Sequence, residues 1–326
     1  VSPPPEARER GSKGTQEQAN SQKSTSNKPK AQKSPISESK ETQPLLFTPP
    51  PPEEAIVEFT YKGYVRRLSK NGSRSNLKSN DDFVIKNLEA NTQTDLVIVT
   101  GSGKIYPVKV ADIPPTSAGN KGTPLVTLLP NAKETPENLI AYFVLPNALE
   151  TGSVIVATQQ GRIKRVALLE LANLTRRGAT LLKLKDDDRL LYAGLITSNE
   201  EVVLASGGGR LLRLLVNEQQ LPIMGRATQG LPALRLRRSE QLVGACTPYA
   251  EDNILLITQL GYVKLMPISA MPLAQLGNIG TQVFQFTSQS DALAGMVTAK
   301  PKSEVMVVTN TQRIVKVSAD KLKFWG

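Results

Sequence analysis

Residues 155–166 read IVATQQGRIKRV, a pattern from which the architecture of the chain can be inferred. Two runs of β-prone residues flank a short turn that ends in Gly161, which is the composition and length of a β-hairpin. Glycine closes such a turn because it adopts a positive φ without a steric penalty. Thr158 suits the strand edge before the turn, and Ile163 is expected on an apolar face after it. The stretch therefore predicts two antiparallel strands joined by a tight turn.

The same pattern occurs six times, at a spacing of about 50 residues. The other copies are VEFTYKGYVRRL (57–68), VIVTGSGKIYPV (97–108), VLASGGGRLLRL (203–214), LLITQLGYVKLM (255–266) and MVVTNTQRIVKV (306–317). Their turn positions are Gly63, Gly103, Gly209, Gly261 and Gln312, each with Thr or Ser three residues before it and an aliphatic residue two after it. Because Gln312 replaces glycine, we expect the last turn to differ in detail.

Further strand-like runs lie between the hairpins. They are 124–130, 179–185, 232–237 and 281–286, each followed by a second β-prone segment, while 167–174 has the length of two helical turns. About four strands per unit, six times over, predict an all-β, six-bladed β-pinwheel or propeller-like ring, because a lone four-stranded sheet cannot bury both faces. The sequence stops at KFWG326, where other units begin a Gly-rich loop, so the last blade is expected to lack a strand.

The N-terminal part has a different composition. Residues 1–52 consist mainly of Ser, Pro, Lys, Gln, Glu, Thr and Asn, and such a segment buries too little apolar surface to fold. We therefore expect a disordered linker at 1–53 and the β-pinwheel domain at 54–326. Since the chain opens on Val, it is expected to be a fragment, a linker plus a terminal domain of a larger protein.

The composition excludes several classes of function. The chain has no His, which removes Ser-His-Asp and Cys-His catalysis and His-ligated metals. Cys246, the single cysteine, lies in an apolar stretch and is expected to be a buried residue in a reducing compartment. The run TGSGKIY (100–106) lacks the earlier Gly and the Ser or Thr of a phosphate loop and is interpreted as a hairpin turn. The acidic run Asp186–Asp188 lies between strand runs and is interpreted as a polar turn and not as a magnesium site. We expect no catalytic residue, no metal and no cofactor in this chain, no membrane span, and a cytoplasmic location.

The chain is basic, with 40 Lys and Arg against 29 Asp and Glu and a net charge of +11. Cations recur just past the turns, and strand alternation predicts that they face outward while the aliphatic residues face inward. These are Arg66, Arg67, Lys104, Arg162, Lys164, Arg165, Arg210, Arg213, Lys264, Arg313 and Lys316; a second set, in the Gly-containing loops, comprises Lys121, Arg176, Arg177 and Arg226. On a ring these residues form a basic belt suited to the phosphates of double-stranded DNA, since exposed aromatics for stacking on single strands are few.

The repeats resemble the C-terminal DNA-wrapping domain, a β-pinwheel, of the A subunit of bacterial type IIA topoisomerases, DNA gyrase and topoisomerase IV. The resemblance covers about residues 54–326 and rests on the six hairpins, on GYVRRL and ITQLGYVKLMPISAM, and on the loops AGNKGTPLVTLLP and MGRATQGLPALRL. It implies a non-catalytic domain that binds and bends duplex DNA around its rim. The linker would join this domain to a cleavage core, and the enzyme would work at the bacterial nucleoid together with an ATPase B subunit. The nucleophilic Tyr, ATP and magnesium would then belong to the parent enzyme.

One difference between this sequence and the gyrase pattern bears on which of the two enzymes the chain resembles. In gyrase the first repeat is followed by a Gln-Arg-Arg-Gly-Gly-Lys-Gly box, whereas residues 70–81 here, KNGSRSNLKSND, keep only Gly72, Arg74 and Lys78. The resemblance assigns Arg74 and Lys78 to DNA binding. Six repeats favour gyrase, which is preferred on that count, and the degenerate box favours topoisomerase IV. From the residues alone a propeller that serves as a protein-interaction scaffold stays open, as does, less favourably, an enzyme that uses the central channel.

Overall fold

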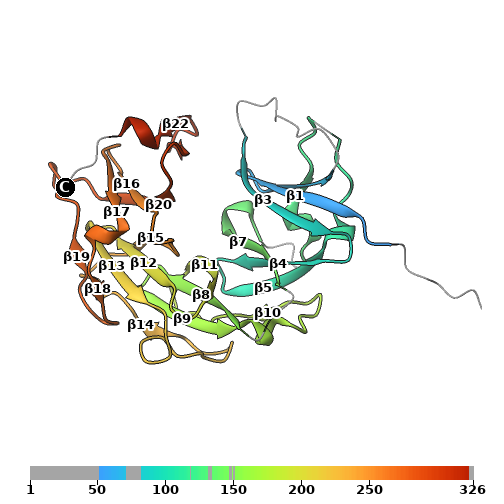
Figure 1. Cartoon of the computed structure of the whole chain (residues 1–326), viewed down its shortest axis with the longest axis horizontal. Coiled ribbons are helices and arrows are strands. Elements are labelled where there is room, and N and C mark those ends of the chain that lie inside the picture. Colours follow the sequence, from blue (N-terminus) through green and yellow to red (C-terminus); the bar gives the residue numbers. More distant parts are fainter. Residues whose placement is uncertain are drawn as a thin grey trace, which may run out of the picture. The chain divides into compact units, whose positions relative to one another are not determined.

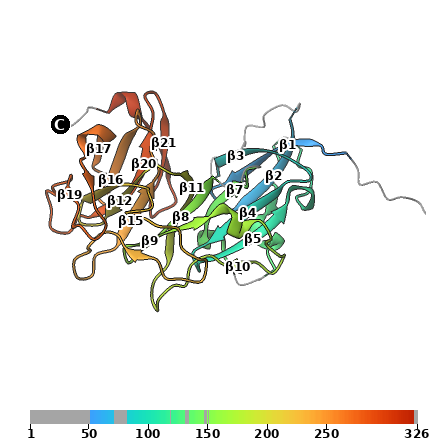
Figure 2. The same ribbon diagram turned by 60° about the horizontal axis from the view of Figure 1, so that its bottom comes forward.

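The computed structural model describes residues 51–70, 82–117, 119–130, 134–146, 149 and 151–322. They belong to one compact unit, Pro50–Gly326, whose sheets follow one another around a ring (Figure 1). The same succession of sheets can be followed in Figure 2. The expected all-β, propeller-like fold is therefore confirmed. No helix among the described residues is long and apolar enough to cross a membrane.

Five of the sheets are blades of three or more strands. Blade 1 has the order β3 (Val84–Asn91), β1 (Glu54–Thr60), β2 (Tyr64–Ser69), β6 (Thr123–Pro124), and blade 2 the order β10 (Ala179–Thr180), β5 (Lys104–Lys109), β4 (Asp95–Thr100), β7 (Leu139–Val144). Blade 3 has the order β11 (Leu190–Thr197), β8 (Gly152–Thr158), β9 (Arg162–Ala167), β14 (Leu231–Pro232). Blade 4 has the order β15 (Leu242–Cys246), β12 (Glu201–Ser206), β13 (Arg210–Leu215), β18 (Leu273–Ala274), with β19 (Thr281–Gln282) also on β13.

Blade 5 is smaller, and the sixth sheet is only a hairpin. Blade 5 has the order β17 (Val263–Pro267), β16 (Asn253–Thr258), β20 (Leu293–Ala299), and the sixth sheet pairs β21 (Glu304–Val308) with β22 (Ile314–Ser318). The expectation of six blades is corrected to five blades and a two-stranded sheet. The other blades take strands from residues that follow their hairpins, and after β22 the described residues hold only the 3-10 turn η6 (Ala319–Lys321).

The remaining regular structure is short. Five further 3-10 turns are η1 (Val110–Asp112), η2 (Leu125–Leu128), η3 (Pro136–Asn138), η4 (Leu168–Leu171) and η5 (Ile268–Ala270). The run 167–174 thus forms a 3-10 turn in place of two helical turns. Of the runs expected as strands, 179–185 and 281–286 pair over only two residues each, at β10 and β19, and 124–130 and 232–237 contribute only their first residue to β6 and β14.

The outer strand of each of blades 1 to 4 comes from the following repeat. In blade 2, Ala179 and Thr180 of β10 pair with Ile105 and Lys104 of β5, which lie in the preceding repeat. A glycine precedes each of these rim strands because the backbones approach closely. A Cβ added at Gly178 would lie 2.4 Å from the carbonyl oxygen of Ile105. Blades 1, 3 and 4 show the same approach at Gly122, Gly230 and Gly280. Each exchanged strand therefore joins its own repeat to the preceding one by β-pairing.

The hairpin turn has one geometry throughout. Gly161 has φ +80°, and its N–H donates to the carbonyl of Thr158 at 3.1 Å, while the Thr158 hydroxyl accepts from the N–H of Arg162 at 3.3 Å. Gln312 also adopts a positive φ, 61°, and donates to the carbonyl of Thr309 at 2.9 Å. The expectation that the sixth turn differs is thus wrong: glutamine accepts the left-handed conformation, at a steric cost that glycine avoids.

Adjacent blades pack face to face, so most of their surface is buried on both sides. In β4, Ile98 belongs to the core between blades 1 and 2, whereas its neighbours Val97 and Val99 belong to the core between blades 2 and 3. Strand β8 divides its residues in the same way between the cores on either side of blade 3. Alternate side chains of a hairpin therefore enter two different apolar cores, and neither set faces water.

Candidate nucleic-acid interface

Four of the cations that follow the hairpin turns are buried. The side chains of Arg66 and Lys164 are 0% exposed, and those of Arg165 and Arg210 are 3% exposed. The prediction that they face outward is wrong: Lys164, Arg165 and Arg210 lie on faces that pack against a neighbouring blade, and Arg66 is covered by the segment that holds Asn120 and Gly122. Their assignment to DNA binding stays a prediction, and direct contact with phosphates would require the covering segments to move.

Each buried cation has partners inside the protein. Arg66 pairs with Glu58, its neighbour across the hairpin, and donates to the carbonyl of Asn120 at 3.3 Å. Arg165 donates to the hydroxyls of Ser153 and Ser198 and pairs with Glu218 at 2.7 Å. Arg210 pairs with Glu240 and donates to the carbonyl of Arg235 at 3.0 Å. These contacts offset the cost of burying charge.

Lys164 of β9 joins two other chain segments through its ammonium group, one at Leu181 and one at 226–228. Its ammonium group donates to the carbonyl of Leu181 at 2.8 Å, to that of Thr228 at 3.3 Å, and to that of Arg226. Burial lowers the pKa of this ammonium group to about 8, while the charge of Glu170 opposes the shift. In blade 5 the equivalent Lys264 is half-buried and donates to the carbonyl of Val283 at 2.8 Å. Both lysines link neighbouring blades.

Other predicted cations are half-buried and engaged. Arg213 forms a bidentate pair with Glu201 at 2.7 and 2.8 Å, Arg162 donates to the carbonyl of Gln229 at 3.0 Å, and Arg226 pairs with Glu170 at 3.2 Å. Arg67 is half-buried, 3.5 Å from the carbonyl of Val110. Arg74 and Lys78 lie outside the described residues.

The exposed members of the predicted set are divided equally between rim loops and hairpins. The rim loops hold Lys121, Arg176 and Arg177, and the hairpins hold Lys104, Arg313 and Lys316. Arg176 pairs with Asp112 at 2.9 Å, and Lys316 lies 3.6 Å from Glu304, yet both side chains stay open to solvent. Exposed pairs of this kind contribute little to stability, so these cations remain available to an anionic partner.

Sequence reasoning missed a further group of exposed cations on the rim. These are Lys183 and Lys185, which follow β10, and Arg235, Arg237 and Arg238, which follow β14. The available signal was spacing, since each segment carries cations five and seven residues after its rim glycine. Backbone hydrogen bonds join consecutive rim segments, from the N–H of Lys183 to the carbonyl of Thr228 at 3.1 Å and from that of Arg235 to Asn278 at 3.0 Å.

We name nine exposed cations of blades 1 to 3 the rim track, eight from the rim segments and Lys104, which lies on β5 opposite Thr180 of the rim strand β10. It comprises Lys104, Lys121, Arg176, Arg177, Lys183, Lys185, Arg235, Arg237 and Arg238. Six members correspond in pairs on successive blades, Lys121 with Arg177, Lys183 with Arg235 and Lys185 with Arg237, so positive charges follow the rim from one blade to the next. Such an arrangement suits a long polyanion with regularly spaced charges.

No catalytic constellation is found in the part of the chain that the structure describes. Asp188 is buried and accepts the N–H of Gln160 at 3.0 Å and that of Arg189 at 2.9 Å, so it supports a hairpin turn, as expected for a polar turn. Among the described residues, no three acidic or cysteine side chains gather as metal ligands would.

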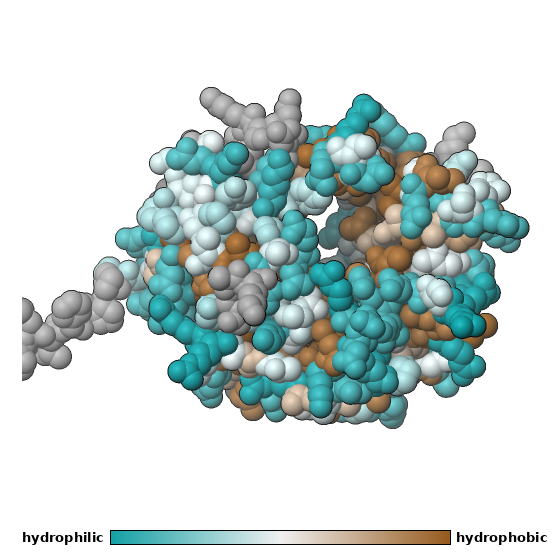
Figure 3. All heavy atoms as spheres, turned by 180° about the vertical axis from the view of Figure 1, so that it is seen from behind, coloured by the Kyte–Doolittle hydropathy of each residue, from teal (hydrophilic) through white to brown (hydrophobic). Residues whose placement is uncertain are grey.

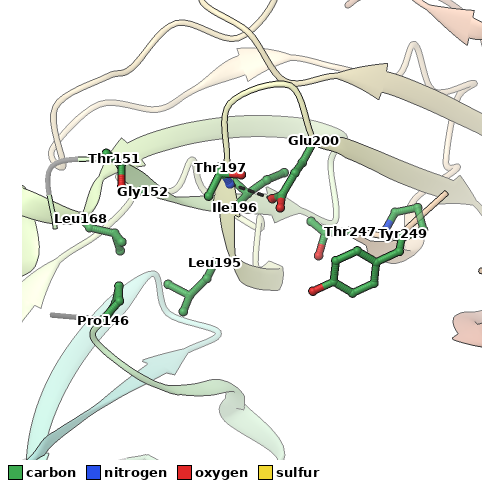
Figure 4. A pocket seen from close by; sticks show the side chains of 11 residues that line it. Pro146, Thr151, Gly152, Leu168, Leu195, Ile196, Thr197, Glu200, Thr247 and Tyr249 are labelled. Carbon is green, nitrogen blue, oxygen red and sulfur yellow. Dashed lines mark hydrogen bonds between the residues drawn. The ribbon is translucent and has the colours of Figure 1, made fainter. Parts of the chain in front are cut away.

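A pocket of about 410 Å³ lies away from the rim track, among the connections that precede and follow β8, β11 and β15. Figure 4 shows Pro146, Leu168 and Leu195 on one side of it and Tyr249 on the other. The carboxylate of Glu200 accepts the N–H of Thr197 at 2.7 Å. Figure 3 shows a hollow near the middle of the ring, bordered on one side by apolar residues. No cation lines this pocket, so it has no phosphate-binding character.

Comparisons with known proteins point to one family. The family model described as DNA gyrase C-terminal domain, beta-propeller, matches residues 94–138, 152–197, 200–245 and 252–273. The A subunit of DNA topoisomerase 4 from Synechocystis sp. is 34% identical over 308 residues, which cover 88% of this chain and 32% of the relative. The A subunit of DNA gyrase from Escherichia coli is 27% identical over 285 residues, which cover 84% of this chain and 32% of the relative.

A solved structure shares the fold. The crystal structure of the C-terminal domain of DNA topoisomerase IV superposes with a TM-score of 0.75 at 22% identity, covering 84% of this chain and 86% of that one. The chain spans about a third of the length of the two curated relatives it matches, at 32% of each.

Proposed function

Because the chain belongs to the family of C-terminal β-propeller domains of the A subunits of DNA gyrase and topoisomerase IV, we propose that it binds duplex DNA along the rim track and bends it. The observation that carries this proposal is the recurrence of exposed cations at corresponding rim positions, with Lys121 on blade 1, Arg177 and Lys183 on blade 2, and Arg235 on blade 3. Duplex DNA that follows these blades must curve with them.

The binding energy is proposed to come from phosphates. Each neutralised phosphate of duplex DNA contributes about −0.9 to the slope of log K against log salt, so nine rim cations set a limit of roughly −8. Because the rim carries few aromatic side chains for base stacking, duplex DNA should bind more tightly than a single strand.

We further propose that the chain acts as the non-catalytic C-terminal part of the A subunit of a type IIA topoisomerase. Its partners would be the cleavage core of the same polypeptide and an ATPase B subunit, with ATP and magnesium used there and not by this domain. The enzyme would act on the nucleoid in the bacterial cytoplasm. Bent DNA held on the rim would be presented to the core for strand passage.

The choice between the two enzymes turns on whether DNA is wrapped chirally. The six hairpin repeats of the sequence favour gyrase, on which the proposal leans, although the sixth repeat forms only a two-stranded sheet. Two observations favour topoisomerase IV as a second candidate: residues 70–81 do not keep the gyrase box, and the relative from Synechocystis sp. is 34% identical against 27% for the gyrase relative from E. coli.

The test is a topology assay on the purified chain. The protein is bound to nicked circular duplex, the nick is ligated, the protein is removed, and the linking-number distribution is read on a gel. A positive shift that grows with protein supports chiral wrapping and gyrase, whereas binding without a shift supports topoisomerase IV. No binding to duplex at low salt would overturn the proposal and favour a protein-interaction scaffold.

A charge-reversal control separates DNA binding from a scaffold. Substituting Arg176, Arg177, Lys183 and Arg235 with Glu removes exposed charges without touching the buried cations. We expect the variant to keep the thermal transition of the wild type and to lose DNA binding. Reversal of Arg66, Lys164 or Arg165 would not be informative, since those side chains are buried in the fold.

A further inference from the structure

The rim segments of the four blades with exchanged strands differ sharply in charge. Segment 175–185 carries four cations, Arg176, Arg177, Lys183 and Lys185, and segment 226–238 also carries four, Arg226, Arg235, Arg237 and Arg238. Segment 119–130 carries Lys121. Segment 277–287 of blade 4 carries none, and no Lys or Arg occurs anywhere between Lys264 and Lys300.

The backbone of blade 4 is built like the others. Thr281 and Gln282 of β19 pair with Leu211 and Arg210, as Ala179 and Thr180 pair with Ile105 and Lys104 in blade 2. A Cβ on Gly280 would lie 2.7 Å from the carbonyl oxygen of Leu211, which is the same close approach as in the other blades. Apart from the additional strand β18, which pairs parallel to β13, the rim of blade 4 presents equivalent positions to solvent with different side chains.

Those positions hold neutral or apolar side chains. In the position before the rim glycine, blades 1 and 2 have Lys121 and Arg177, whereas blades 3 and 4 have Gln229 and Ile279, the latter 59% exposed. Five residues after the glycine, blades 2 and 3 have Lys183 and Arg235, whereas blades 1 and 4 have Thr127 and Gln285. Of these four blades, blade 4 alone has a neutral side chain at both positions.

Exposed apolar residues on blade 4 add to its difference from the charged rims of blades 1 to 3. Leu273 of β18 is 52% exposed, and together with Pro272 and Ile279 it lines a hollow of about 380 Å³. Arg235 of the preceding rim segment is the one cation in the lining of this hollow, and blade 4 itself contributes none. Neutral and apolar side chains neutralise no phosphate and release no counterions.

We infer that duplex DNA contacts the rims of blades 1 to 3 and leaves the rim before blade 4. This inference rests on the proposed function and adds to it where the bound path ends. The cations that return after Lys300 lie past this neutral stretch of the rim, so the DNA track is interrupted and does not run around the whole ring.

The test compares two pairs of substitutions at equivalent exposed positions. Arg177→Glu with Lys183→Glu alters blade 2, and Ile279→Glu with Gln285→Glu alters blade 4. A phosphate contact contributes about 10-fold to affinity at 0.1 M salt, so the blade 2 pair should weaken duplex binding roughly 100-fold. The blade 4 pair should weaken it less than about 3-fold, because its new charges lie off the DNA path. Thermal melting checks that both variants fold.

A tethered cleavage probe gives an independent measurement. An iron-EDTA group is attached to Cys introduced by Lys183→Cys or by Gln285→Cys, while the native Cys246 is buried and stays unlabelled. We expect cuts in bound duplex from position 183 and none from position 285. Equal cutting, or equal weakening by the two pairs, would overturn the inference while leaving DNA binding intact. If the wild-type chain does not bind duplex at all, the proposed function itself fails.

Discussion

The ammonium group of Lys164 lies 2.8 Å from the carbonyl oxygen of Leu181, although the two residues belong to different blades. Lys164 is part of β9 in blade 3, and Leu181 directly follows β10, the rim strand of blade 2. Because the same ammonium group also bonds to Arg226 and Thr228, one side chain fixes two consecutive rim segments. A cation of the hairpin thus positions the loops that carry the exposed charges.

Removing this ammonium group should destabilise the domain. In Lys164→Met three carbonyls, that of Leu181 in a buried bond and those of Arg226 and Thr228 in half-buried ones, lose a charged donor, and we expect a loss of about 2–4 kcal/mol in the free energy of unfolding. Lys264→Met is the matched control, since Lys264 has one such bond, to Val283, and is half-buried. Urea denaturation measures both. Equal losses in the two variants would contradict the role assigned to Lys164.

The same lysine should make stability depend on pH. Burial lowers the pKa of Lys164 to about 8, below the ordinary value of 10.5 that applies in the unfolded chain. Between these two values the unfolded chain binds more protons than the folded one, so this lysine makes stability rise with pH. The rise should be present in the wild type and absent from Lys164→Met. Parallel pH profiles of the two proteins from 8 to 10.5 would refute this expectation.

The exchanged rim strands give two equivalent glycines different tolerance to substitution. Gly103 and Gly261 both end a hairpin turn with positive φ, at 75° and 89°. A Cβ on Gly103 would lie 2.6 Å from the carbonyl oxygen of Leu182, whereas nothing lies within 4 Å of one on Gly261. Gly261→Ala should therefore cost only the backbone strain of about 1–2 kcal/mol. Gly103→Ala should cost clearly more, as thermal melting would show.

The hairpins could be predicted from the sequence because their signal is local. Thr158, Gly161 and Arg162 are joined by hydrogen bonds within one turn, so a spacing pattern reveals them. The rim strands could be predicted only in part. The run 179–185 is β-prone throughout, yet only two of its residues pair, because pairing is set by the edge of β5 in the preceding repeat. No local pattern encodes that partner.

The burial of the cations could not be predicted from strand alternation. Alternation separates two faces of a strand, but it does not tell whether the second face meets water or another blade. In β4 both faces are apolar, with Val97 and Ile98 in different cores, and this was a signal that the blades pack on both sides. Glu58, directly across the hairpin from Arg66, was the signal for a buried pair.

Cys246 should be unreactive in the folded protein. It is buried, and burial, followed by the charge of Asp252, raises the pKa of its thiol to about 12. Only the thiolate is nucleophilic, so iodoacetamide at pH 8.5 should leave native protein unmodified and label it fully in urea. Mass spectrometry measures the extent of labelling. Rapid labelling of the native protein would show that the core between blades 4 and 5 opens.

The buried pair of Arg66 and Glu58 separates a structural cation from a DNA-binding one. Arg66→Met alone leaves the Glu58 carboxylate buried without its partner and should cost about 3–5 kcal/mol in stability, whereas Arg66→Met combined with Glu58→Leu should recover most of that loss. The double variant should also keep the salt slope of duplex binding, because a side chain with no exposed surface neutralises no phosphate. Lys104→Gln, at an exposed position, should reduce the magnitude of that slope by about 0.9 without loss of stability. Binding titrations at salt concentrations from about 0.05 to 0.2 M measure the slope of log K against log salt for both variants. A smaller slope in the double variant would show that the blades open on DNA and that Arg66 meets a phosphate after all.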